Sequence, residues 1–167
     1  MKPIIAYINM RPHLAKWVHY MCNLAEGEHV SLRGGGLIGY LIKEQLTTKA
    51  VIFDEEPLKR NPYTSRVSFL VDKTQYRSGR IFMSRRGTRY VNAILHRMMV
   101  EYLQMQILTL GQLHGMQARQ VIEWFMEQTG IDYDDIEYDS LKKANYRLMK
   151  ERDYMDIRKI RQNASIK

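Results

Sequence analysis

The stretch SRRGTRYVNAILHRMMVEYLQMQILTL, residues 84–110, decides the fold class of this 167-residue chain. Apolar side chains recur along it every three or four residues from Val91 to Met105. This spacing predicts a long amphipathic helix that ends near Leu110. Thr88 is the expected N-cap, because its hydroxyl can accept a hydrogen bond from a free backbone N–H of the first turn.

Two more helices are expected on the C-terminal side. The apolar spacing of residues 121–126 predicts a second helix, which Gly130 ends. An acidic linker, residues 132–139, leads to a third helix that starts near residue 139. This linker is longer than the turn of a tight helix-turn-helix motif. We therefore expect residues 85–167 to form a looser, helix-turn-helix-like unit of three helices with a basic tail.

The N-terminal side of the long helix alternates expected strands and helices. A helix should begin at Pro12 and another near Leu37. The alternating apolar residues of 67–71 and 81–83 predict a β-hairpin with a long polar loop. Residues 1–84 should thus form a small α+β unit, although one core could also span both halves. The remaining short strands are predicted at residues 4–9, 29–32 and 50–53.

The composition excludes several classes of protein. Apolar residues make up 45% and charged residues 26% of the chain, as in an ordinary globular protein. A single cysteine excludes a disulfide scaffold and indicates a reducing compartment, so we expect a cytoplasmic protein. No apolar run is long enough to span a membrane. The net charge of +8 indicates an acidic partner, with nucleic acid the first candidate and no cofactor expected.

The charge is segregated along the chain. Residues 54–100 carry ten Lys and Arg against four Asp and Glu, and residues 140–167 carry nine against three. Between them, residues 101–139 carry one against eight. Two interpretations stay open at this point. Either the acidic segment neutralises its neighbours in the folded protein, or two separate basic surfaces contact one polyanion.

The third C-terminal helix is the first candidate for nucleic-acid contact. Lys143, Arg147 and Lys150 follow one another at i, i+4 and i+7 and therefore share a helix face. Lys142 and Asn145 lie on its flanks. Such groups pair with phosphates, and Asn and Arg also suit bidentate contacts with base edges. The alternative is the solvated basic face of an ordinary amphipathic helix.

The predicted hairpin and the turn that follows it are the second candidate. Cations there would neutralise phosphates, whereas we interpret the interleaved aromatic residues as core. The alternative is a set of exposed arginines on a sheet. The candidate residues are Lys73, Arg77, Arg80, Arg85, Arg86 and Arg89.

A glycine motif offers a different function. Residues 34–39, GGGLIG, match the pattern G-x-G-x-x-G between an expected strand and an expected helix, and Asp54 follows the next expected strand. This order is typical of dinucleotide-binding sites, in which Gly34, Gly36 and Gly39 would surround the phosphates. The preceding strand is short and polar, and no series of βαβ units follows. We therefore favour a close-packed glycine turn over a nucleotide site.

Metal sites are not predicted. His13, His19, Cys22 and His29 are nominal zinc ligands, but they lack the tight pairing of usual metal sites. The acidic run of residues 132–139 fails the calcium-loop pattern, which needs Gly at position six and Glu at position twelve. We interpret this run as a solvated linker.

Five fragments of the chain carry a resemblance. They are residues 11–17 (RPHLAKW), 84–87 (SRRG), 125–131 (FMEQTGI) and the pieces DSLKK (139–143) and YR (146–147) of the last helix. These fragments are similar to segments of small basic proteins from bacterial prophages and mobile elements. The resemblance implies a phage or mobile-element context and a role in regulation or DNA handling. It carries over no catalytic residue.

Taken together, these features predict a non-enzymatic nucleic-acid-binding protein, with DNA the favoured partner. The alternative is an oligomeric structural or interaction module, because the eleven methionines fall largely on apolar helix faces. A nucleotide-binding enzyme built on Gly34 to Gly39 is the third hypothesis.

Overall fold

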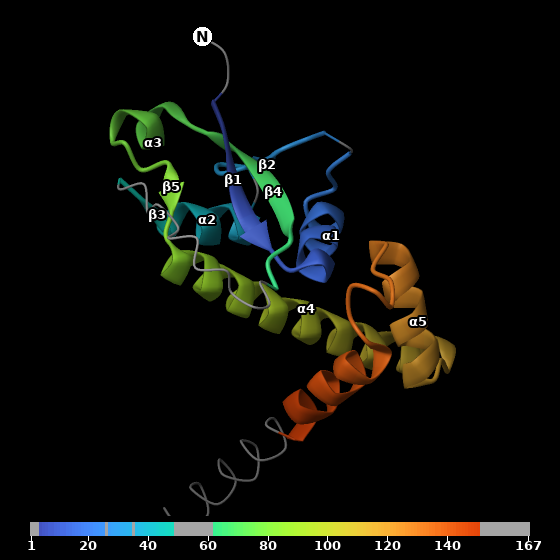
Figure 1. Ribbon diagram of the computed structural model, residues 1–167. Helices are drawn as coiled ribbons and strands as arrows, with labels where there is room; N and C mark the ends of the chain where they lie inside the picture. The colour runs from blue at the N-terminus through green and yellow to red at the C-terminus, as the bar shows by residue number, and fades with distance from the viewer. Residues whose placement is uncertain (1–3, 26, 35, 49–61, 151–167) are drawn as a thin grey trace, which may run out of the picture.

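The structure is a computed structural model that describes residues 4–25, 27–34, 36–48 and 62–150. It has the mixed α+β fold expected from the sequence, with strands and helices in the N-terminal part and helices after them (Figure 1). Three expectations fall outside the described residues. They are the strand at residues 50–53, the candidate Asp54 and the basic tail beyond residue 150.

A three-stranded sheet forms the N-terminal part. Strand β1 (Ile4–Met10) runs antiparallel to β4 (Ser65–Val71), and β2 (Val30–Ser31) runs parallel to β4 on its other side. Ile8 of β1 lies opposite Val67, and both are buried, whereas Tyr7 is exposed. Because side chains alternate across a strand, one face of the sheet is turned to the core and the other to solvent.

Helices cover the buried face of the sheet. Helix α1 (Pro12–Met21) packs on β4, and α4 (Arg85–His114) packs on β1 and α1. In Figure 1, α4 runs beneath the sheet, and α5 (Ala118–Thr129) lies near its C-terminal end. One cluster of buried side chains joins all these elements and includes Trp17, Val67, Leu95 and Leu141. The two halves of the chain therefore share one hydrophobic core.

The three C-terminal helices confirm that part of the prediction, with changed bounds. Helix α4 begins at Arg85 because the Oγ of Ser84 accepts a hydrogen bond from the Gly87 N–H at 2.9 Å. The prediction that Thr88 is the N-cap is wrong, because Thr88 is buried in the first turn of the helix. The helix continues past Leu110 to Gly115, whose φ of 65° ends it in the left-handed region.

Gly130 ends α5 in the same way, as expected. Residues 130–137 are non-helical, and residues 138–150 form the third helix, named below the 138–150 helix. The long connection agrees with the looser arrangement expected for this unit. It does not form the tight turn of a helix-turn-helix motif.

The predicted β-hairpin is wrong. The Asp72 carboxylate accepts hydrogen bonds from the N–H groups of Thr74 and Gln75, at 2.8 and 2.9 Å, and starts the short helix α3 (Lys73–Arg77). Strand β5 (Phe82–Met83) pairs with β3 (Leu46–Thr47) in a separate two-stranded sheet. Strand β4 already has β1 on one edge and β2 on the other, so neither edge is left for β5.

The glycine-rich segment is a close-packed turn. Helix α2 (Gly36–Glu44) begins there, and a Cβ at Gly39 would lie 2.5 Å from the carbonyl oxygen of Ser31. The Oγ of Ser31 also accepts a hydrogen bond from the Gly34 N–H at 2.9 Å. The backbone φ of Gly36 is +56°, a value that residues with a side chain rarely adopt. Turn geometry thus accounts for Gly36 and helix–strand packing for Gly39, whereas Gly34 makes only ordinary contacts with Ser31. The preceding strand β2 has only two residues.

Gly39→Ala should lower the free energy of unfolding by about 1–3 kcal/mol. The new methyl group would meet a backbone carbonyl, which cannot rotate away as a flexible side chain can. Urea unfolding measures the effect. Gly34→Ala is the matched control, because its Cβ would contact only the Ser31 side chain at 3.4 Å. Equal unfolding free energies for the two variants would contradict the close-packing interpretation.

Candidate nucleic-acid interface

The 138–150 helix presents four basic side chains to solvent: Lys142, Lys143, Arg147 and Lys150. None of the four forms an ion pair with another described residue. The Nζ of Lys150 lies 5.2 Å from the ring centroid of Tyr146, a cation–π contact that leaves the charge at the surface. On the opposite side of the helix, Leu141 is fully buried in the core.

Asn145 lies apart from these basic residues. Its side chain is buried, with 8% of the residue exposed, and its Nδ2 is 4.0 Å from the Sδ of Met149. The position faces inward because it follows the buried Leu141 by four residues, or about one helical turn. Asn145 is therefore not among the side chains that this helix offers to a partner.

The basic residues of the second candidate region do not share a hairpin face. They are distributed over α3, the following loop and the first turn of α4. Arg80 is exposed, but its Nε donates to the carbonyl oxygen of Leu46 at 3.1 Å and so ties the loop to β3. Arg85 is half-buried. The other members of this set, Lys73, Arg77, Arg86 and Arg89, are exposed.

A cleft of about 590 Å³ lies where three helices meet. The start of α1, the middle of α4, the linker residues 134–137 and the start of the 138–150 helix form its walls. Its basic lining residues are Arg11, His13, His96, Lys143 and Arg147, and its acidic ones are Asp134, Asp135 and Glu137. The cleft thus continues inward from two of the exposed cations of the 138–150 helix.

Asn92 positions the α1 side of the cleft. This buried α4 residue donates from Nδ2 to the carbonyl oxygens of Asn9 at 3.1 Å and Thr88 at 2.8 Å. Its Oδ1 accepts a hydrogen bond from the Arg11 N–H at 3.1 Å. The end of β1 and the cap of α1 are therefore held on α4, next to His96 one turn further along.

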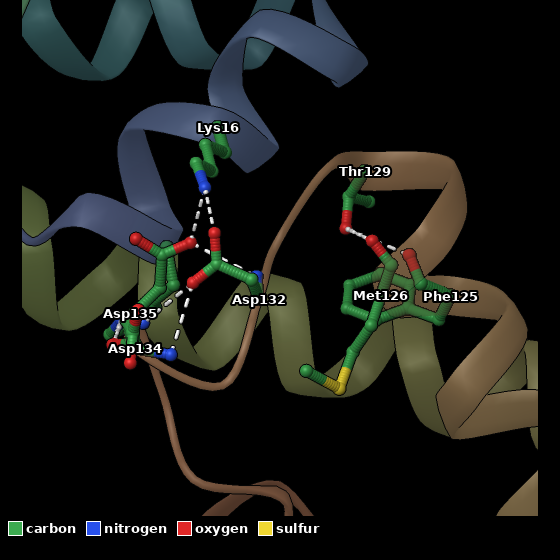
Figure 2. Close-up of polar contacts among 8 residues, drawn as sticks. Lys16, Phe125, Met126, Thr129, Asp132, Asp134 and Asp135 are labelled. Carbon is green, nitrogen blue, oxygen red and sulfur yellow. Dashed lines mark hydrogen bonds and ion pairs between the residues drawn. The ribbon is translucent and has the colours of Figure 1, made fainter.

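A lysine holds the acidic linker against α1 (Figure 2). The Nζ of Lys16 lies 2.9 Å from the carboxylate of Asp132 and 2.6 Å from that of Asp135. Asp132 in turn accepts hydrogen bonds from the N–H groups of Asp134 and Asp135. Hydrogen bonds from Lys16 lower the pKa of Asp132 and in return raise the pKa of Lys16. Lys16 ties the linker to α1, while most of the linker residues are exposed, in agreement with the solvated linker expected from the sequence.

Two histidines lie close together at the cleft. The rings of His13 and His96 are 5.7 Å apart between centroids and inclined by 71°. The pKa of His13 is lowered from 6.5 to about 4, mainly by burial; His96 and Arg11 act in the same direction, and the hydrogen bond to the Asp135 carbonyl opposes them. Burial, and then Arg11, also lower the pKa of His96. Both rings are therefore neutral at pH 7.

Sequence reasoning missed this cleft. His13 appeared only as a weak metal ligand, and Arg11 and His96 were not selected. Residues 11 and 13 lie more than 80 positions from residue 96, so only the tertiary structure brings them together. A polar Arg-Pro-His sequence at a helix start was the one available signal. Within the described residues, no group of three or more His, Cys, Asp or Glu side chains could hold a metal ion.

A comparison of the chain with known protein families, curated proteins and solved structures found no match. In the described part of the chain, no helix combines the length and the apolar character needed to cross a membrane.

Proposed function

We propose that this protein binds nucleic acid, with DNA the favoured partner, through the exposed basic side chains of the 138–150 helix. The main support is that four basic side chains of this helix are exposed and form no ion pair with another described residue: Lys142, Lys143, Arg147 and Lys150. Four such cations on one short helix can neutralise phosphates and release their counterions, which is the main source of non-specific affinity. We also propose that the protein acts in a phage or mobile-element context.

The ion pairs favour the interpretation that the basic 138–150 helix contacts an external polyanion over the interpretation that the acidic segment neutralises it. The acidic linker pairs with Lys16 of α1, and Glu123 pairs with Arg119 of the same helix. No described ion pair joins the acidic segment to the 138–150 helix. The basic side chains of that helix are therefore open to an external polyanion, although Asp134 and Glu137 of the acidic segment line the same cleft as Lys143 and Arg147.

The N-terminal turn of α4 offers a second contact. Arg86 and Arg89 are exposed there. Arg86 precedes His96, which borders the cleft, by roughly 15 Å along the helix axis at 1.5 Å per residue. A nucleic acid a few base pairs long therefore spans that distance. We expect the arginines to add phosphate contacts rather than base recognition.

Lys143→Ala combined with Arg147→Ala tests the proposal. If each side chain neutralises one phosphate of a duplex, the slope of log K against log salt should become less steep by roughly 2. Fluorescence anisotropy with labelled duplex DNA, single-stranded DNA and RNA, between about 50 and 200 mM salt, measures it. The control is Arg33→Ala with Arg119→Ala, which removes two charges from other elements. An unchanged slope in the first double variant would refute the assignment of this helix.

A second candidate function is self-association. Met105, Leu108 and Leu113 on the distal half of α4 are 53%, 42% and 72% exposed. Such apolar side chains are typical of an interface when they lie together. Sedimentation over a wide concentration range tests it, and a strictly monomeric profile would argue against it. Self-association is compatible with the main proposal, since many DNA-binding proteins are dimers.

A further inference from the structure

Unsatisfied polar atoms gather at the cleft. Among the described residues, five buried side-chain nitrogen or oxygen atoms have no hydrogen-bond partner. Three of them belong to cleft residues: Nε of Arg11, Nε2 of His13 and Nδ1 of His96. A buried polar group without a partner costs roughly 1–3 kcal/mol, so each calls for an explanation. Three at one cleft, on residues that influence one another electrostatically, indicate the position of a ligand.

The histidine contacts define what the ligand must offer. The Nδ1 of His13 lies 3.3 Å from the carbonyl oxygen of Asp135. A carbonyl oxygen only accepts, so Nδ1 carries the hydrogen of the neutral ring and Nε2 is left as a bare acceptor. The Nε of Arg11 can only donate. The ligand must therefore accept one hydrogen bond and donate another.

The surroundings favour an anion. The cleft lies at the first turns of both α1 and the 138–150 helix, where backbone N–H groups carry partial positive charge. The carboxylate of Asp135 is paired with Lys16 at 2.6 Å, although the same ammonium also pairs with Asp132 at 2.9 Å. Lys143 and Arg147 add positive charge at the exposed side of the cleft. Asp134 and Glu137, also exposed there, are the opposing charges.

We propose that this cleft binds a phosphate monoester at the end of a nucleic-acid strand. A monoester has its second pKa near 6, so a fraction of it carries a P–OH group at neutral pH. The Nε2 of His13 and the Nε of Arg11 are both buried, so binding requires the two side chains to turn toward the cleft. The hydroxyl then donates to the Nε2 of His13 while another phosphate oxygen accepts from the Nε of Arg11. An internal phosphodiester has no such proton. The inference rests on the proposed function, because Lys143 and Arg147 would hold the adjoining strand.

Binding should strengthen as the pH falls from about 8 to 6, because more of the monoester then carries its second proton. The charged and titratable groups that face His13 are Arg11 of its own helix, His96 of α4 and Asp135 of the linker. The carboxylate of Asp135 lies 2.6 Å from the Nζ of Lys16. Asp134→Asn combined with Glu137→Gln should tighten binding, since it removes the two opposing charges.

The experiment compares internally labelled single-stranded oligonucleotides that carry a 5′-phosphate, a 3′-phosphate or hydroxyl groups at both ends. We expect one phosphorylated end to bind at least about tenfold tighter than the hydroxyl strand, which corresponds to 1.4 kcal/mol. His13→Asn should abolish this preference. Its amide can still donate to the Asp135 carbonyl, which helps the variant to fold, and His96→Asn is a second variant. His114→Asn, at an exposed histidine of α4, should retain the preference.

Inorganic phosphate and a nucleoside monophosphate form the remaining arms, read out by thermal shift. Equal affinity for all three strands would overturn the inference and leave the proposed function intact. Stabilisation by free phosphate or the mononucleotide, with no strand bound, would overturn both and identify a small phosphate ester as the ligand. Preference for a phosphorylated end that survives His13→Asn and His96→Asn would also overturn the inference.

Discussion

The free energy of unfolding should fall by about 3 kcal/mol between pH 7 and pH 4 through His13 alone. Burial holds the pKa of this histidine at about 4 in the folded protein, against 6.5 when it is solvated. Between these two pKa values, His13 is therefore protonated in the unfolded chain but not in the folded protein. The stabilisation is complete above pH 6.5 and is lost as the pH falls toward 4, and a difference of about 2.5 units corresponds to about 3 kcal/mol.

Urea unfolding at several pH values between 7 and 4 measures this loss. His13→Asn should flatten the curve, because asparagine does not titrate. His96, whose pKa burial also lowers, adds a loss in the same direction. The Asp72 and Asp132 carboxylates, whose pKa values are lowered, lose their contribution only below their ordinary range near 4. Parallel curves for the wild type and His13→Asn would contradict the burial of a neutral ring.

Leu141→Ala should lower the free energy of unfolding by about 2–5 kcal/mol. Leu141 is fully buried and is the residue of the 138–150 helix that belongs to the core cluster. Its truncation removes the main apolar contact that holds this helix against the rest of the fold. The helix would then open locally at a lower free-energy cost.

Hydrogen exchange distinguishes local opening from general destabilisation. We expect amides of residues 138–150 to exchange faster in Leu141→Ala, while those of β1 and β4 change less. Tyr146→Ala is the control on the same helix, because Tyr146 is exposed and should shift stability by no more than about 0.5 kcal/mol. An unfolding free energy equal to that of Tyr146→Ala would show that Leu141 is not an anchor.

The long helix was the part of the fold most open to prediction. Its apolar period runs from Val91 to Leu103 without interruption, and such a period arises from local geometry alone. The choice of Ser84 over Thr88 as the cap was not predictable in the same way. Both are good N-caps, and the strand pairing of Met83 with Leu46 favours a start immediately after it.

The prediction of a β-hairpin was wrong because strand pairing does not depend on local sequence alone. Alternation at residues 67–71 correctly predicts a strand, but the same pattern is compatible with any partner. The strands β1 and β2, far away in sequence, take the edges of β4. The arginines of the region are in consequence spread over three different elements.

The candidate interface likewise has a part that local spacing predicts and a part that depends on tertiary packing. Lys143, Arg147 and Lys150 share a helix face by spacing alone, and their exposure agrees with the amphipathic pattern. Asn145 was misjudged, because its position relative to Leu141 turns it toward the core. The folding of the acidic linker onto Lys16 could not be foreseen, since 116 positions separate Lys16 from Asp132.

The α+β class, the order of the C-terminal helices and the basic face of the last one could all be predicted from the sequence. These features follow from side-chain periodicity and charge, which act over a few residues. Only the tertiary structure decided that Arg11, His13 and His96 meet at one cleft and that both histidines are neutral. The physical reason is that burial and the approach of distant charges set a pKa, and both depend on how the elements pack.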